Sequence, residues 1–248
     1  MKRFSVLAII LGLTVLALVQ YLPNVFAHDD DDDRERVKIF DRDSVVYGRT
    51  YSDWNAAWQQ WADSIPTANH PLFDNGDCSV GQSGPVWFLG RKFIAVGGTA
   101  DFNNIVRYCN VSAGKALYIA IYNAEDSTLE EATPGSNHFT QVAELRAAAA
   151  YVMDGVTNLS MQVDGKNIRD VKERFRVQSP AYGFTLPADN FLNALGEGPF
   201  EAGTYFPAVD DGYYVMVAPL PLGHHTIHFH GIAGPYVQDV TYHIYVYR

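Results

Sequence analysis

The octapeptide HHTIHFHG, residues 224–231, holds four of the eight histidines in this chain of 248 residues. Alternate side chains of an extended strand lie on one face, so His224, His228 and His230 share a face opposite the apolar residues. Imidazole is a ligand that Zn, Cu and non-haem Fe accept, and catalytic zinc sites typically use three protein ligands. The polar outer face of an antiparallel sheet needs only polar residues, however, and histidine serves there equally well.

A second strand, VQDVTYHIYVY, follows after the short segment GIAGP. Matching the apolar faces of the two strands predicts a hairpin register with His228 opposite Asp239 and His224 opposite His243. Directly opposed Cβ atoms lie about 4.5 to 5.5 Å apart, so imidazole and carboxylate groups would meet. The sequence therefore predicts either a Cu, Zn or Fe site or a solvated polar face. Its members are His224, His228, His230, Asp239 and His243.

No complete catalytic motif accompanies this patch. The sequence contains no H-E-x-x-H, P-loop or G-x-G-x-x-G motif, and GQSGP at 81–85 is not a nucleophile elbow. Neighbours in a strand face opposite ways, so Glu130–Glu131 and Asp210–Asp211 do not form glycosidase dyads by themselves. The fragment TIHFHG resembles the H-x-H-G copper motif of multicopper oxidases, but neither cysteine has the flanking histidines of those enzymes.

The amino terminus has the layout of a secretory signal peptide over residues 1–27. Lys2 and Arg3 precede an apolar run, and the small residue Ala27 ends the segment. The alternative is a retained membrane anchor, because no charged residue interrupts the run. Either interpretation predicts a secreted, periplasmic or cell-surface protein, with contact to a membrane only if the anchor is retained.

An acidic segment, residues 28–40, follows and is expected to be a disordered lead-in to the folded domain. It contains five consecutive aspartates, Asp29 to Asp33. Removal of residues 1–27, which hold two basic and no acidic residues, changes the formal net charge from −10 to −12. An acidic chain repels phosphate backbones, so nucleic acid is not expected as a partner.

The two cysteines, Cys78 and Cys109, are expected to form a disulfide. An exported chain meets an oxidising compartment, and no third cysteine competes. A cysteine metal site is the weaker alternative, because neither a C-x-x-C motif nor a nearby histidine pair is present.

The segment YSDWNAAWQQWADSIP, residues 51–66, predicts a helix with Ser52 as N-cap and Pro66 at its end. Its three tryptophans fall on one face, which favours packing against a core over a sugar-stacking platform. They are Trp54, Trp58 and Trp61. Further helices are expected at 140–153 and 188–196.

The rest of the chain is rich in β-branched and aromatic segments separated by turn residues, including KFIAVGG at 92–98. Asp164 and Gly165 predict a type I′ hairpin turn. No linker divides residues 41–248, so we expect one domain. We predict a mainly β, single-domain antiparallel β-sandwich, of jelly-roll or Ig-like type, with two or three packed helices.

Several segments together resemble an uncharacterised family of secreted prokaryotic proteins. They are YGRTYSDWNAAWQQWADSIP, GQSGPVWFLG, AGTYFPAVDDGYYVMVAPLPLGHHTIHFHG and DVTYHIYV. The resemblance implies one exported domain to which the C-terminal hairpin belongs, and it favours a structural role for His225 and His228. It implies no activity.

The combined interpretation is an exported β-sandwich that binds an extracellular ligand or protein, or assembles with one. Two alternatives stay open. The first is a metal-binding protein or metal-dependent enzyme that uses the histidine hairpin. The second is glycan binding through surface tyrosines, namely Tyr213, Tyr214, Tyr236 and Tyr245.

Overall fold

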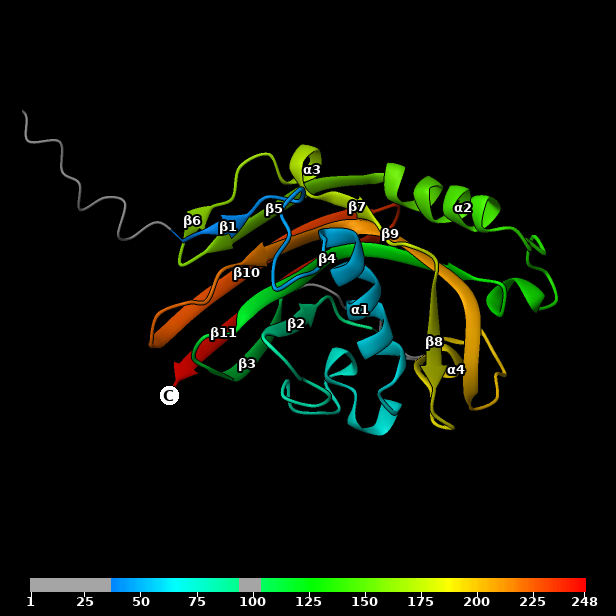
Figure 1. Ribbon diagram of the computed structural model, residues 1–248, viewed down its shortest axis with the longest axis horizontal. Coiled ribbons are helices and arrows are strands. Elements are labelled where there is room, and N and C mark those ends of the chain that lie inside the picture. The colour runs from blue at the N-terminus through cyan, green and yellow to red at the C-terminus, as the bar shows by residue number, and fades with distance from the viewer. Residues whose placement is uncertain (1–36, 94–103) are drawn as a thin grey trace, which may run out of the picture. The chain divides into compact units, whose positions relative to one another are not determined.

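Two mixed β-sheets pack together, with helices around them, in the computed structural model of the chain (Figure 1). The structure describes residues 37–93 and 104–248, which fall within one unit, Val37–Arg248. The predicted signal segment 1–27, the aspartate run and residues 94–98 of the strand expected at 92–98 lie outside the described residues. The prediction of a mainly β sandwich with a few helices is confirmed.

The first sheet is organised around the long strand β9 (Gly203–Val217). Strand β4 (Ala116–Ser127) pairs with one edge of β9, and β2 (Val86–Gly90) pairs with β4. Three short strands occupy the other edge of β9, namely β8 (Tyr182–Leu186), β7 (Arg176–Gln178) and β1 (Ile39–Phe40). Because β1 lies within 28–40, the sheet begins earlier in the chain than the sequence predicts.

The second sheet has the order β3–β11–β10–β5–β6. Its strands are β3 (Ile105–Ser112), β5 (Val156–Val163), β6 (Lys166–Asn167), β10 (Gly223–Ala233) and β11 (Tyr236–Tyr247). Two pairs, β2–β4 and β3–β11, are parallel, which differs from the fully antiparallel prediction. The chain passes from β2 in the first sheet to β3 in the second and back to β4, so β4 returns beside β2 in the same direction.

The apolar face of the C-terminal hairpin is buried, as predicted, and it packs toward the first sheet. Ile227, Phe229, Val240 and Ile244 are buried. The hydroxyl of Tyr242 on the same face donates to the carbonyl of Gly90 in β2 at 2.8 Å. The β5–β6 turn also follows the prediction, since Asp164 and Gly165 both have positive φ.

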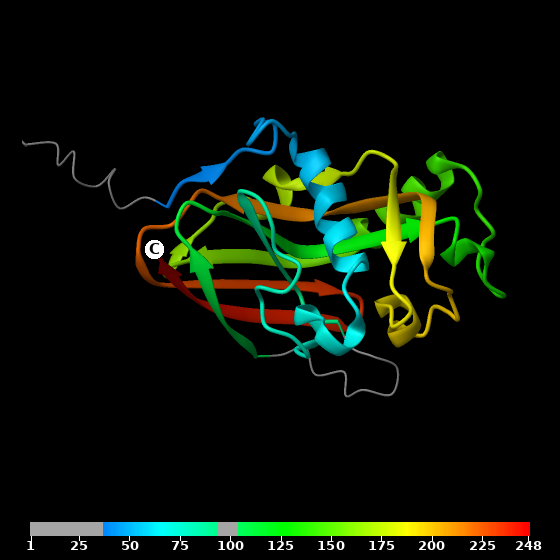
Figure 2. The ribbon, with the colours of Figure 1, turned by 60° about the horizontal axis from the view of Figure 1, so that its bottom comes forward.

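Helix α1 (Tyr51–Asp63) crosses β4 and β9 on the face of the first sheet that looks away from the second (Figure 2). Its N-cap is Thr50, so the prediction of Ser52 is wrong by two residues. The Thr50 hydroxyl and the Asp53 carboxylate form a reciprocal capping box, which fixes the start. The three tryptophans are buried as expected, and Trp58 donates to the Leu89 carbonyl at 2.8 Å.

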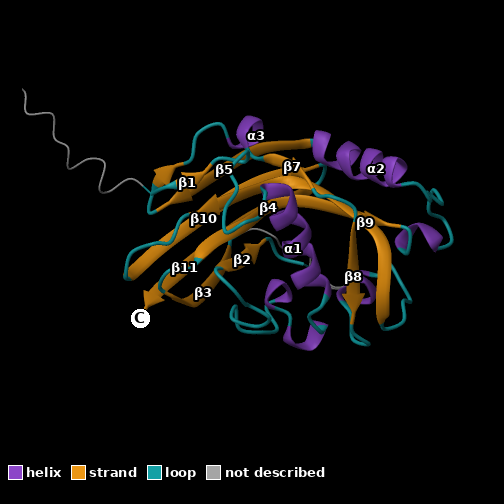
Figure 3. Ribbon diagram, viewed as in Figure 1, coloured by secondary structure: helices purple, strands orange, loops and turns teal. Residues whose placement is uncertain are grey.

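The remaining helices surround the sheets (Figure 3). The expected helices at 140–153 and 188–196 are α2 (Val142–Asp154) and α4 (Phe191–Leu195). A one-turn helix, α3 (Val171–Arg174), was not predicted because four residues carry no helical periodicity. Three short 3₁₀ helices complete the described set, namely η2 (Thr67–Asn69), η3 (Pro71–Phe73) and η4 (Glu130–Ala132).

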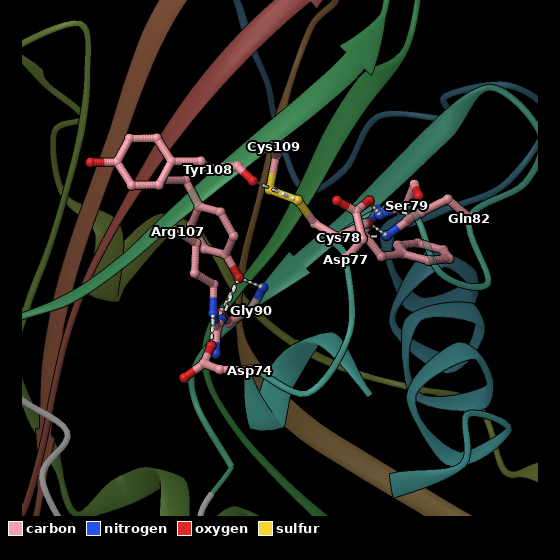
Figure 4. Close-up of a disulfide and its surroundings, with 11 residues drawn as sticks. Asp74, Asp77, Cys78, Ser79, Gln82, Gly90, Arg107, Tyr108 and Cys109 are labelled. Carbon is pink, nitrogen blue, oxygen red and sulfur yellow. Dashed lines mark hydrogen bonds and ion pairs between the residues drawn. A yellow bond between two sulfur atoms is a disulfide. The ribbon is translucent and has the colours of Figure 1, made fainter. Parts of the chain in front are cut away.

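The predicted disulfide Cys78–Cys109 is present and joins the segment after α1 to β3 (Figure 4). The buried guanidinium of Arg107 reinforces the same junction. Its Nε donates to Asp74 at 2.6 Å, and its Nη1 donates to the Gly90 carbonyl at 2.9 Å. This part of the chain is therefore fixed by covalent and charged contacts next to the sheets.

Candidate functional site

The histidine hairpin has a register different from the predicted one. His230 lies opposite Asp239, and His224 lies opposite Tyr245, so each predicted pairing is wrong by two positions. The cause is the turn: the strands stay paired as far as Ala233 and Tyr236, which leaves only the two residues between them as the loop. A longer loop was assumed from the sequence GIAGP.

Three of the five predicted metal ligands nevertheless meet. Asp239 contacts His228 Nε2 at 3.1 Å through Oδ1 and His230 Nδ1 at 3.2 Å through Oδ2. The other two lie apart, with His224 against the Tyr245 ring and His243 stacked on Tyr108. In residues 37–93 and 104–248, no group of three or more His, Cys, Asp or Glu side chains is arranged to hold a metal ion. Metal binding here stays a prediction.

Two of the four tyrosines proposed for glycan binding lie on the surface, and the other two do not. Tyr236 and Tyr245 are exposed, but Tyr213 and Tyr214 are buried, so their predicted surface position is wrong. Both lie in the middle of β9, which is covered on its two faces. Tyr214 packs against Trp58 of α1, and the Tyr213 hydroxyl reaches the carbonyl of Met153 in α2.

A group of acidic residues, here called the acidic cluster, lies between α1 and the first sheet and was not predicted from the sequence. It consists of Asp63, Glu125, Glu130 and Asp210. Glu125 of β4 lies directly opposite Asp210 of β9. An irregularity in β4 between Ala120 and Tyr122 sets this register. Helix α1 contributes a buried polar row at i, i+4 and i+8, namely Asn55, Gln59 and Asp63.

Uncharged side chains supply the hydrogen bonds of the acidic cluster. Asn123 donates to Asp210 Oδ2 at 2.7 Å, and Gln59 donates to Asp63 Oδ1 at 3.0 Å. The Ser127 hydroxyl donates to Glu130 Oε2 at 2.6 Å. Several buried atoms of the cluster and its surroundings have no hydrogen-bond partner within the described structure. These are Asn55 Oδ1, Asp63 Oδ2, Glu125 Oε1, Asp126 Oδ2 and the Tyr182 hydroxyl.

Burial and mutual repulsion favour the protonated forms of these acids. Burial raises the pKa of Asp210 to about 7 and raises the pKa of Asp63 well above its usual value. The pKa of Glu125 is raised first by burial and then by the charge of Glu130, whose own pKa burial also raises. The Glu125 and Glu130 side chains are hydrogen bonded to each other, which couples the two carboxyl groups.

A cavity of about 930 Å³ lies beside the acidic cluster. Strand β2 ends at Gly90, opposite Ala120, so among the described residues the last part of β4 has no strand partner on that edge, and the cavity lies there. Glu125 and Glu130 are part of its wall. The apolar part of the wall comes from Phe93, Tyr122, Tyr151, Val152, Phe191, Leu192, Leu195 and Tyr236.

Arg91, directly after β2, is the one basic side chain among the described residues that line the cavity. Its Nε donates to Asn123 Oδ1 at 3.4 Å, and its guanidinium lies over the rings of Phe93 and Tyr122. Half-burial against these rings removes water and lowers its pKa from the usual arginine value. No acidic side chain of the described chain forms an ion pair with it.

Comparison with known proteins adds little to this geometry. No family model and no curated protein matches the chain. Among solved structures, a cysteine protease inhibitor from Entamoeba histolytica is similar at a TM-score of 0.21 and 9% identity, over 65% of this chain and 96% of the inhibitor. That TM-score supports no conclusion. Of the helices the structure describes, none has the length and apolar character needed to cross a membrane.

Proposed function

We propose that this protein is an exported binding protein that holds a small organic molecule in the cavity beside the acidic cluster. The observation that carries the proposal is the wall of the cavity, which combines apolar and aromatic side chains with polar and charged ones, including Arg91, Glu125 and Glu130. Ligand sites typically have this composition and enclose roughly 300 to 1,000 Å³. The disulfide supports export, because such bonds persist in oxidising compartments.

A purely structural role explains the acidic cluster less well. Buried acids that only stabilise a fold are normally paired with a cation or fully hydrogen bonded. Here none of the described basic side chains forms a hydrogen bond with the four acids, and Asp210 interacts with Arg91 through charge alone. Groups with strongly shifted pKa values beside a cleft are candidates for binding or chemistry, because structural stability does not require them.

A cavity-filling variant tests the proposal. Val152 of α2 lines the cavity and is 47% exposed, so Val152→Trp adds bulk to the cavity without displacing buried core. Ala143→Trp, at an exposed position of the same helix that does not line the cavity, is the matched control. The probes are amino acids, small amines, carboxylic acids and monosaccharides, each added to the full chain during thermal unfolding.

At ten times its dissociation constant, a bound compound stabilises the native state by about 1.4 kcal/mol. For a domain of this size that raises Tm by about 3 to 6 °C. We expect at least one probe class to give this shift in the native chain and in Ala143→Trp but not in Val152→Trp. Absence of any shift in Tm, or an equal shift in Val152→Trp, would contradict the proposal. A structural role for the protein would then be the remaining interpretation.

A further inference from the structure

We infer that the cavity binds a small zwitterion with an apolar body, of the class of free amino acids with apolar side chains. The ammonium group would contact Glu125 and Glu130, and the carboxylate would contact Arg91. The inference rests on the proposed function and adds to it the chemistry of the ligand.

The carboxyl side of the cavity is suited to an ammonium group. Glu130 is held in place by Ser127, while Glu125 Oε1 is buried and has no hydrogen-bond partner in the described structure. Tyr182 of β8 is 5% exposed, and its hydroxyl is also without a partner among the described residues. After burial, the charges of Glu125 and Asp63 are the largest causes that raise the pKa of this hydroxyl. An ammonium group has three donors and no acceptor, which matches such a set of oxygens.

The opposite charge comes from Arg91. Its Nη groups donate no hydrogen bond to described residues, which leaves a planar fork of the shape that binds a carboxylate through two bonds. Arg91 contacts Asn123, which lies two residues before Glu125 on the same face of β4. Such positions are about 7 Å apart. Arg91, Glu125 and Glu130 all line the same cavity, so one ligand can contact both kinds of charge.

The rest of the wall selects the body of the ligand. Phe93 and Phe191 stack with their ring centres 5.5 Å apart, and Leu192 and Leu195 of α4 complete an apolar surface beside them. A neutral sugar would leave both charged ends unmatched. A simple amine would be repelled by Arg91, and a simple carboxylate would leave the acids without a cationic partner, so only a molecule with both charges satisfies the two ends.

Four probes with the same phenyl body separate these cases. They are L-phenylalanine, phenethylamine, 3-phenylpropionate and 2-phenylethanol, titrated calorimetrically into the full chain at pH 7. A hydrogen bond to a charged group corresponds to roughly a tenfold to hundredfold change in affinity. We therefore expect L-phenylalanine to bind at least about tenfold more tightly than each of the other three.

Variants assign the two ends. Arg91→Gln is expected to weaken the binding of L-phenylalanine at least about tenfold and to leave the binding of phenethylamine unchanged or tighter. Glu125→Gln is expected to weaken the binding of L-phenylalanine but not that of 3-phenylpropionate. Lys92→Gln is the matched control, because Lys92 contacts Asp74 at 3.0 Å and does not line the cavity. If a variant does not fold, the comparison of the four probes on the native chain decides.

The outcomes separate the inference from the proposed function. Equal binding of 2-phenylethanol and L-phenylalanine, or tighter binding of phenethylamine, would contradict the inference of a zwitterionic ligand. The proposed function of the cavity as a ligand-binding site would still stand. Absence of binding by all four probes overturns the inference as well. In that case the proposed function survives only if another probe class stabilises the native chain but not Val152→Trp.

Discussion

The most direct consequence of the buried acidic cluster is a loss of stability as pH rises. The substitution Asp210→Asn should remove much of this pH dependence. Asp210 is 1% exposed, and burial raises its pKa from 3.8 to about 7. The folded chain therefore keeps a proton that the unfolded chain releases above pH 4. A carboxyl with a raised folded-state pKa contributes stability that is complete below its unfolded pKa and is lost as pH rises through the folded pKa.

The size of the effect follows from the two pKa values. Between pH 5 and pH 8 the native chain is expected to lose about 3 kcal/mol of unfolding free energy through Asp210, at 1.36 kcal/mol per unit of pKa shift. Asparagine can keep both hydrogen bonds of the site. Its amide oxygen accepts from Asn123 and its amide nitrogen donates to the Tyr214 hydroxyl, where Asp210 now accepts from both.

The measurement is urea unfolding of the native chain and of Asp210→Asn at pH 5, 6, 7 and 8. Burial lowers the pKa of His70 to about 4, so the contribution of His70 to stability increases as pH rises. Because His70 is present in both proteins, this contribution cancels in the difference between their unfolding free energies. Asp43→Asn, at a side chain that is 94% exposed, controls for the change in net charge. An unchanged pH slope in Asp210→Asn would refute the reasoning.

Three other substitutions test the packing and the hairpin. Trp58→Ala should lower the unfolding free energy by about 3 to 5 kcal/mol, because the indole is fully buried, and unchanged thermal unfolding would contradict this. Replacing Cys78 and Cys109 by serine should remove about 4 kcal/mol for a closed loop of 31 residues, measured by denaturant unfolding. His228→Ala, at a half-buried position, should change stability by less than about 0.5 kcal/mol. The metal prediction for this hairpin requires one Zn, Cu or Fe per chain purified without a histidine tag, and substoichiometric metal would exclude it.

Local patterns predicted much of the fold. The tryptophan spacing of α1 and the alternation in β10 and β11 are properties of adjacent residues, so the buried faces were correct. Strand β9, which begins at Gly203, is less evident from such patterns. Its first half contains acids whose burial depends on distant partners, such as Arg176, which binds Asp211 from 35 residues away. Periodicity within one segment carries no information about such partners.

The site was harder to predict because its residues meet only through tertiary pairing. Glu125 and Asp210 are 85 positions apart and oppose each other only in the register that the β4 irregularity creates. One local signal was available, since Asn55, Gln59 and Asp63 form a polar row beside the tryptophan stripe of α1. A polar row next to three tryptophans would normally face solvent, whereas here it is buried against the acids of the sheet. The histidine register failed for a simpler reason, the unknown length of the turn.

Two neighbouring residues of β9 provide an internal comparison that supports a binding role for the acidic cluster. Asp210 and Asp211 are both buried, but they lie on opposite faces of the first sheet. Asp211 is neutralised by Arg176 through two bonds of 3.0 Å and is also bonded by Gln178. Asp210, facing α1, receives only uncharged donors, and no described basic side chain pairs with it. The fold therefore pairs a buried acid on the face away from the cluster, while on the α1 face it leaves carboxyl groups unpaired beside a cavity that can admit a cationic group.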